Sequence, residues 1–455
     1  MQYEPIAAIA TPQGTGGIGV IRISGEGAFA VAQTVFRAES GKLLAEMSGY
    51  TASYGKVLDA GGVIDEAIAL VFKTPKSYTG EDVVEFSCHG GETVLRRVLA
   101  AVFQAGARMA DPGEFTKRAF LHGRMDLTEA EAVMQLIGAQ NEDAARAALA
   151  QHEGALFYRV QEIKGILYQI SAELAAYFDY PDDDIPALTP EAVVPRLEEA
   201  QDRLTALCDR YESGKVIRDG VAVAIVGKPN VGKSTLMNLM LGEERSIVTP
   251  VAGTTRDIVE ESVWFAGATL RLFDTAGLRE TEDVVEQIGV ARAKEKLNHA
   301  ALIFALFDGS RPLDAEDEAL FSMLRGKRVL AILTKADLPQ RCDGNRVRAA
   351  FSSVLSLSAA HGTGLDQLES GVRAALQLDN FDPRAAMLAN ARQLDCVVRA
   401  KAAIAECQKA LSAGFTLDVL SVELQAASGA LAELTGEQAS EAVIEKVFAQ
   451  FCVGK

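Results

Sequence analysis

A glycine-rich loop constrains this chain more than any other feature of its sequence. Segment 227–234, GKPNVGKS, has the pattern G-x-x-x-x-G-K-S and follows the apolar run VAVAIVG. In such a loop, glycines let successive backbone N–H groups face a phosphate chain, and the helix that follows adds positive potential. Lys233 would contact the β- and γ-phosphates, and Ser234 would bind Mg²⁺. The pattern predicts a P-loop between a strand and a helix.

Two later motifs extend this site toward Mg²⁺ and the γ-phosphate. Asp274-Thr275-Ala276-Gly277 ends a predicted strand, and its D-x-x-G pattern supplies an acidic group on the Mg²⁺ side and a backbone N–H for the γ-phosphate. Segment 253–257, GTTRD, lies between the two motifs. Its Thr255 is the candidate to close over Mg²⁺ in the triphosphate state.

The motif Thr334-Lys335-Ala336-Asp337 predicts which base is bound. The Asp337 carboxylate can accept hydrogen bonds from N1–H and the 2-amino group of guanine, an edge that adenine lacks. Ser358-Ala359-Ala360, after the next predicted strand, completes a guanine pocket. Thr334 stands where the common N-K-x-D pattern has asparagine. This departure leaves open how tightly guanine is bound, but the predicted choice of guanine over adenine is unaffected.

Hydrolysis needs a group that this G domain lacks at the usual position. The residue after D-x-x-G is Leu278, which cannot hydrogen-bond to an attacking water as the glutamine of Ras-type GTPases does. Asn230 offers a side-chain oxygen near the phosphates, where a monovalent cation could neutralise transition-state charge. Leu278 and Asn230 together motivate the hypothesis of cation-assisted GTP hydrolysis.

The pattern of apolar residues predicts a multidomain α/β protein. An α+β domain over residues 1–119 is predicted by the short β-type runs IAAIATP, GIGVIRISG, AIALVFKTP and VVEFSCHGG and one helical stretch, ETVLRRVLAAVFQAG. Long helical periodicity follows over 120–217. Strands alternate with helices over 218–375, which predicts a doubly wound, mostly parallel sheet. Residues 376–455 are helical again. We therefore expect a G domain inserted into a helical domain whose two halves flank it.

Charge and composition exclude several classes of protein. The chain has 62 acidic and 45 basic residues, and its net charge of -17 disfavours a protein that binds nucleic acid over much of its surface. Any RNA contact must therefore be local or shared with a partner. The longest apolar run, Ala300–Phe307, is too short to span a bilayer, and the N-terminus has no signal-peptide pattern. Six cysteines without a C-x-x-C pair fit a reducing compartment. We expect a soluble, cytoplasmic protein without a membrane partner.

With GKPNVGKST, GTTRD, DTAGLRE followed by EQIG, and a chain ending Phe-Cys-Val-Gly-Lys, the sequence resembles the MnmE (TrmE) family of tRNA-modification GTPases over essentially its whole length. The resemblance implies that K⁺ is bound by Asn230, Thr249, Val251 and Thr254, and that Glu286 orients the attacking water. Catalysis would then involve Glu286, Lys233, Thr255 and Asn230. The implied GTP-binding set is Asn230, Val231, Gly232, Lys233, Ser234, Thr235, Thr249, Pro250, Val251, Ala252, Gly253, Thr254, Thr255, Asp274, Thr275, Ala276, Gly277, Thr334, Lys335, Ala336, Asp337, Ser358, Ala359 and Ala360.

The N-terminal part is similar to the folate-binding, dimer-forming domain of that family. The likeness implies that Arg22, Glu81, Arg124 and the terminal Lys455 contact a tetrahydrofolate derivative in its 5,10-methylene or 5-formyl form. Cations suit the glutamate tail of folate, and a carboxylate suits the donor edge of the pterin. The resemblance also implies a homodimer whose G domains meet across their nucleotides, and a heterotetramer with the FAD-containing partner MnmG. Together these proteins would add a (carboxymethyl)aminomethyl group at C5 of the wobble uridine, position 34, of certain tRNAs.

Several alternatives stay open at this point. A ribosome-assembly or signalling switch GTPase would bind RNA itself and no folate, and a dimer scaffold with a degenerate G domain would not turn over GTP. Cys452 is either placed near the folate for one-carbon chemistry or a buried structural thiol. Asp182–Asp184 is interpreted as a solvated loop. His89 is interpreted as a turn residue after a strand, because no acid–base partner is apparent near it.

Overall fold

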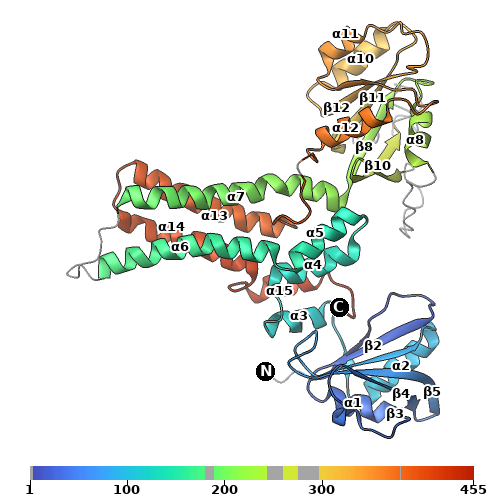
Figure 1. Cartoon of the computed structure of the whole chain (residues 1–455), viewed down its shortest axis with the longest axis vertical. Coiled ribbons are helices and arrows are strands. Elements are labelled where there is room, and N and C mark those ends of the chain that lie inside the picture. Colours follow the sequence, from blue (N-terminus) through green and yellow to red (C-terminus); the bar gives the residue numbers. More distant parts are fainter. Residues whose placement is uncertain (1–3, 180–188, 243–259, 275–296, 380) are drawn as a thin grey trace, which may run out of the picture. The chain divides into compact units, whose positions relative to one another are not determined.

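Residues 4–179, 189–242, 260–274, 297–379 and 381–455 are described by this computed structural model. They form two compact units (Figure 1). The first comprises residues 1–134, 151–201 and 395–455, and the second comprises residues 135–150 and 202–394. Asp182–Asp184 lies outside the described residues.

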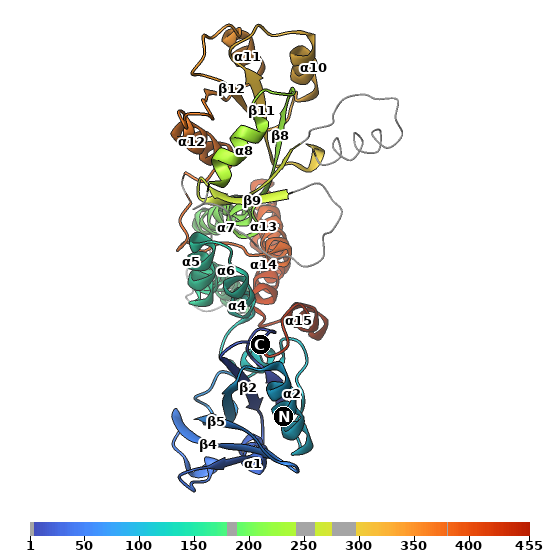
Figure 2. The same ribbon diagram turned by 90° about the vertical axis from the view of Figure 1, so that its right-hand side faces the viewer.

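A seven-stranded sheet forms the N-terminal part of the first unit. Its spatial order is β3-β4-β5-β6-β2-β1-β7, and all neighbouring strands are antiparallel except β1 and β7. Helices α1 and α2 cover one face, where Ile21, Val84 and Phe86 are fully buried (Figure 2). The elements are β1 (Ile6–Ile9), β2 (Ile18–Ser24), α1 (Ala28–Val35), β3 (Phe36–Ala38), η1 (Leu44–Glu46), β4 (Thr51–Asp59), β5 (Gly62–Phe72), β6 (Val83–His89), α2 (Glu92–Gln104), β7 (Arg108–Met109) and α3 (Glu114–Leu121). The predicted α+β domain is confirmed.

Helices follow, with α6 packed on α14 and α15 on α3 within the first unit. Between residues 127 and 179 the predicted helical run is broken twice. Asn141 caps α5 by accepting from the Ala144 N–H, and Gly154 adopts φ 91° before α6. The helices are α4 (Leu127–Gly138), α5 (Glu142–His152), α6 (Ala155–Asp179), α7 (Pro190–Asp219), α13 (Ala391–Ser412), η2 (Leu417–Val419), α14 (Leu420–Thr435) and α15 (Glu441–Phe448). No helix among the described residues is both long and apolar enough to cross a membrane.

The second unit contains the predicted doubly wound sheet. Its order is β13-β12-β11-β8-β10-β9, and every neighbouring pair is parallel except β9 and β10. Alternate residues of β8 enter two cores: Val223 and Ile225 face α8 and α12, whereas Ala224 and Val226 face α10 and α11 (Figure 1). The elements are β8 (Val221–Gly227), α8 (Lys233–Leu241), β9 (Glu260–Phe265), β10 (Ala268–Asp274), β11 (Leu302–Asp308), α10 (Ala315–Met323), β12 (Val329–Thr334), α11 (Gly344–Ala350), β13 (Val354–Ser356) and α12 (Leu365–Ala375). The carboxyl ends of its parallel strands are where such sheets bind ligands.

Candidate functional sites

The glycine-rich loop joins β8 to α8, as its pattern predicts. Gly227 and Gly232 have φ of 154° and 107°, and Asn230 has φ of 60°. A Cβ atom at Gly227 would lie 2.8 Å from the Leu306 carbonyl oxygen, so a side chain would not fit there. Helix α8 begins at Lys233, and Ser234 and Thr235 are exposed in its first turn. The loop therefore presents hydroxyls and a helix N-terminus to solvent at the carboxyl end of β8, an arrangement suited to phosphate and Mg²⁺.

The ammonium group of Lys233 is held within this loop. Its Nζ donates to the carbonyl oxygens of Gly227 at 2.8 Å and Lys228 at 3.1 Å. These contacts keep the cation beside the loop, where it can reach the phosphates.

Thr334 links the base-recognition motif to the P-loop. It ends β12 with a fully buried side chain, and its hydroxyl donates to the Val231 carbonyl oxygen at 2.7 Å; the Phe307 carbonyl oxygen lies 3.1 Å away. A threonine at this position thus ties the end of β12 to the backbone of the P-loop.

The two predicted halves of the guanine pocket lie together. Ser358 is buried, and its hydroxyl donates to Oδ1 of Asp337 at 2.5 Å. This hydrogen bond is the main cause that lowers the pKa of the exposed Asp337 carboxyl below its ordinary value. The Ala336 N–H donates to the Leu357 carbonyl oxygen at 3.2 Å, which fixes the two segments side by side.

Lys335 is fixed by an acid that the sequence reasoning did not single out. Its Nζ lies 2.7 Å from Oδ2 of Asp308, the last residue of β11. Burial opposes ionisation of Asp308, but hydrogen bonds from Lys335 and Ser310 outweigh it and lower the pKa of the carboxyl. The position of Asp308 at the carboxyl end of an apolar strand is the signal that could have indicated it.

A second missed group is Lys228, within the P-loop itself. It contacts Asp314, the N-cap of α10, and lies 3.2 Å from Oδ2 of Asp317 in the first turn of that helix. The hydrogen bond from Lys228 lowers the pKa of Asp314 to about 2. The P-loop is thereby tied to α10 on the side away from α8.

The remaining predicted nucleotide residues are not described by the structure. Asp274 ends β10 beside Ile225 of β8, but its side chain lies outside the described residues. The others are Thr249, Pro250, Val251, Ala252, Gly253, Thr254, Thr255, Thr275, Ala276, Gly277, Leu278 and Glu286. Their predicted roles stay predictions.

In the first unit, the C-terminus meets the strand that carries Arg22. The guanidinium of Arg22 donates through Nε to Glu85 Oε1 at 2.7 Å and through Nη1 to the Gly454 carbonyl oxygen at 3.4 Å. Its Cζ lies 5.5 Å from the ring centres of both Tyr78 and Phe115. The Arg22 cation thus lies near two aromatic rings, of which Phe115 is fully buried and Tyr78 is partly exposed.

The last residues are held against the N-terminal sheet. Gly454 has φ of 98°, and a Cβ there would lie 2.4 Å from the Ile9 carbonyl oxygen. The Cys452 carbonyl oxygen accepts from the Gly113 N–H at 3.3 Å, and Phe451 is buried. Cys452 itself is exposed, so the structural-thiol alternative, which required burial, is wrong for this residue.

Lys455 shares the surroundings of Arg22. Its pKa is lowered by burial first and by the charge of Arg22 second, while Glu85 opposes the shift. Glu85 thus pairs with Arg22 and its charge acts on Lys455, two of the three predicted folate cations, and it was not among the predicted residues. The signal was an acid within the apolar strand VVEFSC, opposite Arg22 in the strand register.

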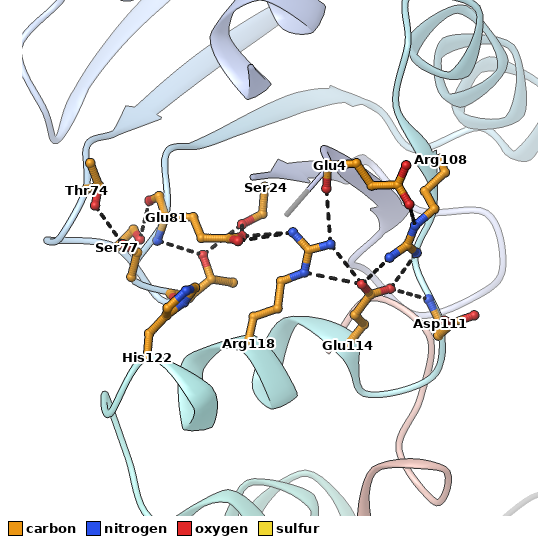
Figure 3. Close-up of polar contacts among 12 residues, drawn as sticks. Glu4, Ser24, Thr74, Ser77, Glu81, Arg108, Asp111, Glu114, Arg118 and His122 are labelled. Carbon is orange, nitrogen blue, oxygen red and sulfur yellow. Dashed lines mark hydrogen bonds and ion pairs between the residues drawn. The ribbon is translucent and has the colours of Figure 1, made fainter. Parts of the chain in front are cut away.

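Glu81 is held by a buried array of charges (Figure 3). Its carboxylate accepts from Nη1 of the fully buried Arg118 at 3.1 and 3.2 Å, and from the Ser24 hydroxyl at 2.7 Å. Arg118 also donates to Glu114 at 2.9 Å, and Glu114 accepts from Arg108. Burial opposes ionisation of Glu114, but Arg108 and Arg118 hold its pKa at about 2. The orientation of the Glu81 carboxylate is therefore fixed by Arg118, which α3 carries.

Arg124, the fourth predicted folate residue, lies near Glu81. It is exposed, and its Cγ is 3.5 Å from the position that a Cβ on Gly80 would take. The structure brings Arg22 close to Lys455 and places Arg124 beside the turn that carries Glu81.

The interpretation of His89 is corrected by the structure. His89 is the last residue of β6 and has an acid partner: its Nδ1 lies 2.6 Å from Oδ1 of Asp65 on the neighbouring strand β5. The hydrogen bond to Asp65 raises the pKa of His89. The neighbouring Cys88 is buried, and burial raises its pKa to about 12. Among the described residues there is no cluster of His, Cys, Asp and Glu that could hold a metal ion, so His89 and Asp65 do not belong to such a cluster.

Comparison with known proteins matches nearly the whole chain. A family model described as the N-terminus of the GTP-binding protein TrmE matches residues 5–124, and one described as the MnmE helical domain matches residues 127–452. Curated relatives are called tRNA modification GTPase MnmE. Those of Geobacillus kaustophilus, Heliobacterium modesticaldum and Symbiobacterium thermophilum are 41%, 42% and 42% identical, and each match covers 100% of both chains. Among solved structures, Era of Aquifex aeolicus is 29% identical over 40% of this chain and 66% of that chain, with a TM-score of 0.28.

Proposed function

The chain belongs to the MnmE family, and on that premise we propose that it is a GTPase that acts in tRNA modification. The observation that carries the proposal is the contact between Ser358 and Asp337 beside a P-loop that is tied to the same segment through Thr334. Phosphate-binding and guanine-selecting groups meet at one end of one sheet. The Asp337 carboxylate would favour guanine over adenine, because adenine lacks the N1–H and 2-amino donors that the carboxylate can accept.

Magnesium and potassium are part of this proposal. The exposed Ser234 hydroxyl at the start of α8 fits a Mg²⁺ ligand, and Thr255 and the side chain of Asp274 would complete that side. Asn230, which holds a left-handed backbone conformation in the P-loop, would bind K⁺ together with Thr249, Val251 and Thr254. The cations supply positive charge to the phosphates, while Lys233 binds them and Glu286 orients the water.

The N-terminal cluster would bind a tetrahydrofolate derivative. Arg22 and Lys455 offer two cations for the glutamate tail, and the partly exposed ring of Tyr78 beside Arg22 offers a flat surface. Glu81, oriented by Arg118, has a lone pair on Oε1 that could accept a pterin N–H, and Arg124 lies near it. Exposed Cys452 would lie at this cluster.

The oligomeric state, the partner and the modification reaction are proposed from membership of the family. We propose a homodimer that assembles with the FAD-dependent MnmG into a heterotetramer in the cytoplasm. The pair would use the carbon of methylene-tetrahydrofolate to add a (carboxymethyl)aminomethyl group at C5 of uridine 34 of certain tRNAs. GTP-dependent changes in the G domain would rearrange the complex rather than perform the modification step.

GTP turnover in K⁺ and in Na⁺ tests the proposed hydrolysis. We expect faster turnover in K⁺, and a kcat about 10²-fold lower for Asn230→Ala and for Glu286→Ala. Asn345→Ala, which changes an exposed asparagine of α11, is the matched control and should leave the rate unchanged. Equal rates in the two salts would refute the role of Asn230.

A further inference from the structure

A polar pocket lies on the edge of the second unit away from the nucleotide site. It has a volume of about 500 Å³ and opens where β12 and β13 begin, whereas the P-loop and Asp337 follow the carboxyl ends of strands. Its walls come from the segment after α10, the end of α11 and the end of α12. A ligand there would not compete with GTP for space.

The charged residues that line this pocket are all basic. They are Arg325, Lys327, Arg328 and Arg346, and none of the described lining residues is an aspartate or glutamate. The chain as a whole has 62 acidic and only 45 basic residues. A locally basic pocket on an acidic protein attracts anions that the rest of the surface repels.

Three of the four cations are not paired with an acid of the described residues and can therefore bind an anion. Arg346 is engaged: it donates to both oxygens of Glu318, and its Cζ lies 5.0 Å from the ring centre of Phe321. Lys327 donates to the neutral amide oxygen of Asn298 at 2.8 Å, which orients it without cancelling its charge. Arg325 and Arg328 are exposed, and neither has an ion-pair partner within the described part of the chain. Uncompensated arginines of this kind suit phosphate oxygens.

The placement of these cations favours an extended polyanion over a single small anion. Arg325 and Arg328 stand on the exposed rim, while a site for one phosphate ion usually surrounds it with buried donors. Ser352 and Ser353 also line the pocket and offer hydroxyl donors. A chain of phosphodiesters can contact such a rim at several points.

We propose that this basic pocket contacts the sugar-phosphate backbone of tRNA. The inference rests on the proposed function in tRNA modification, and the contact is local, as the net charge of -17 requires of any RNA contact that is not shared with a partner. Because phosphate contacts carry no sequence information, the pocket would orient the RNA on the G domain rather than select one tRNA.

The test measures binding of unmodified tRNA by the full-length protein over a range of salt concentrations. The double variant Arg325→Gln/Arg328→Gln should bind tRNA about tenfold more weakly, and its slope of log K against log salt should be less steep by about one to two. Its GTP turnover without tRNA and its thermal unfolding should match those of the unaltered protein.

A matched control removes the same charge elsewhere in the same unit. Arg210 and Arg384 are exposed arginines outside the pocket, and Arg210→Gln/Arg384→Gln should keep the original affinity and slope. The proposal is overturned if the pocket variant binds tRNA normally, if the control loses as much affinity, or if the unaltered protein does not bind tRNA. GTP turnover in the same samples tests the proposed GTPase separately, so the two failures can be told apart.

Discussion

At the scale of residues, one hydroxyl controls the ionisation of the guanine-recognition carboxylate. Ser358 donates to Asp337 and lowers its pKa. A lowered pKa means that the carboxylate stays ionised, and able to accept from guanine, to a lower pH than an ordinary aspartate. The same bond stabilises the fold above the ordinary pKa of aspartate, and this contribution is lost as the pH falls through the lowered value.

Replacing Ser358 by alanine should therefore move the acid limb of GDP binding to higher pH. Affinity near neutral pH should fall only a few-fold, because the Asp337 carboxylate is exposed and water can replace the Ser358 hydroxyl. The measurement is the dissociation constant of a fluorescent GDP as a function of pH. Ser370→Ala, on the exposed face of α12, is the control. An unchanged acid limb in Ser358→Ala would contradict the assignment.

The motifs predicted which residue types form the guanine pocket, but not what holds them. Thr334 was recognised as a departure from the usual asparagine, yet its bond to Val231 joins residues 103 positions apart. Lys228 and its partner Asp314 are separated by 86 positions. Sequence patterns describe neighbours along a strand or helix, so contacts between segments this distant need the fold.

At the scale of elements, Arg118 joins helix α3 to the sheet. It is fully buried and lies between Glu81 and Glu114, with a further bond to the Glu4 carbonyl oxygen (Figure 3). Removing this cation leaves the buried Glu81 carboxylate without its ion-pair partner and leaves Glu114 with Arg108 alone. The arrangement thus depends on the whole array rather than on one pair.

Arg118→Met should destabilise this region by about 3–5 kcal/mol and weaken folate binding through misdirected Glu81. Hydrogen exchange of the amides in α3 and β2 measures the local effect. Arg97→Gln, which breaks an ion pair with Asp59 at the surface, should change exchange little, since solvent screens such pairs. Arg118→Lys should recover part of the folate affinity. If the amides of α3 and β2 in Arg118→Met exchange as slowly as in the unaltered protein, the buried charges are not needed for the stability of this region.

Elements with strong periodicity were predicted correctly, and those with mixed composition were missed. The runs IAAI and IGVIRIS became β1 and β2, and ETVLRRVLAAVFQ became α2. Strand β4, TASYGKVLD, was not predicted because its exposed Thr51 and Tyr54 and its Gly55 blur the alternation. Gly55 has a tertiary reason: a Cβ there would lie 2.3 Å from the Arg37 carbonyl oxygen of β3.

At the scale of the whole molecule, the first unit is closed by residues from both ends of the chain. Arg22 and Gly454 are separated by 432 positions, and their contact lies beside Lys455. The sequence indicated this neighbourhood only through family resemblance, because no local pattern connects segments so far apart. The proposed domain boundaries, 1–119, 120–217, 218–375 and 376–455, stay predictions.

Deleting residues 453–455 should separate the two proposed activities. Binding of 5-formyl-tetrahydrofolate should weaken at least about tenfold, since the Lys455 cation and the Gly454 contact to Arg22 are both lost. GDP affinity should stay the same, because the nucleotide residues lie in the second unit. Lys455→Arg keeps the charge and should retain most folate affinity. Folate binding by the shortened chain at full affinity would exclude the terminal residues from the site.

The fixed position of Gly454 has a consequence for the order in which the protein is made. The strands of the N-terminal sheet are translated long before Gly454, because 432 positions separate Arg22 from the carbonyl that it contacts. A nascent chain can fold its sheet but cannot complete this cluster until Gly454 has left the ribosome. A chain truncated before Gly454 therefore lacks the cluster.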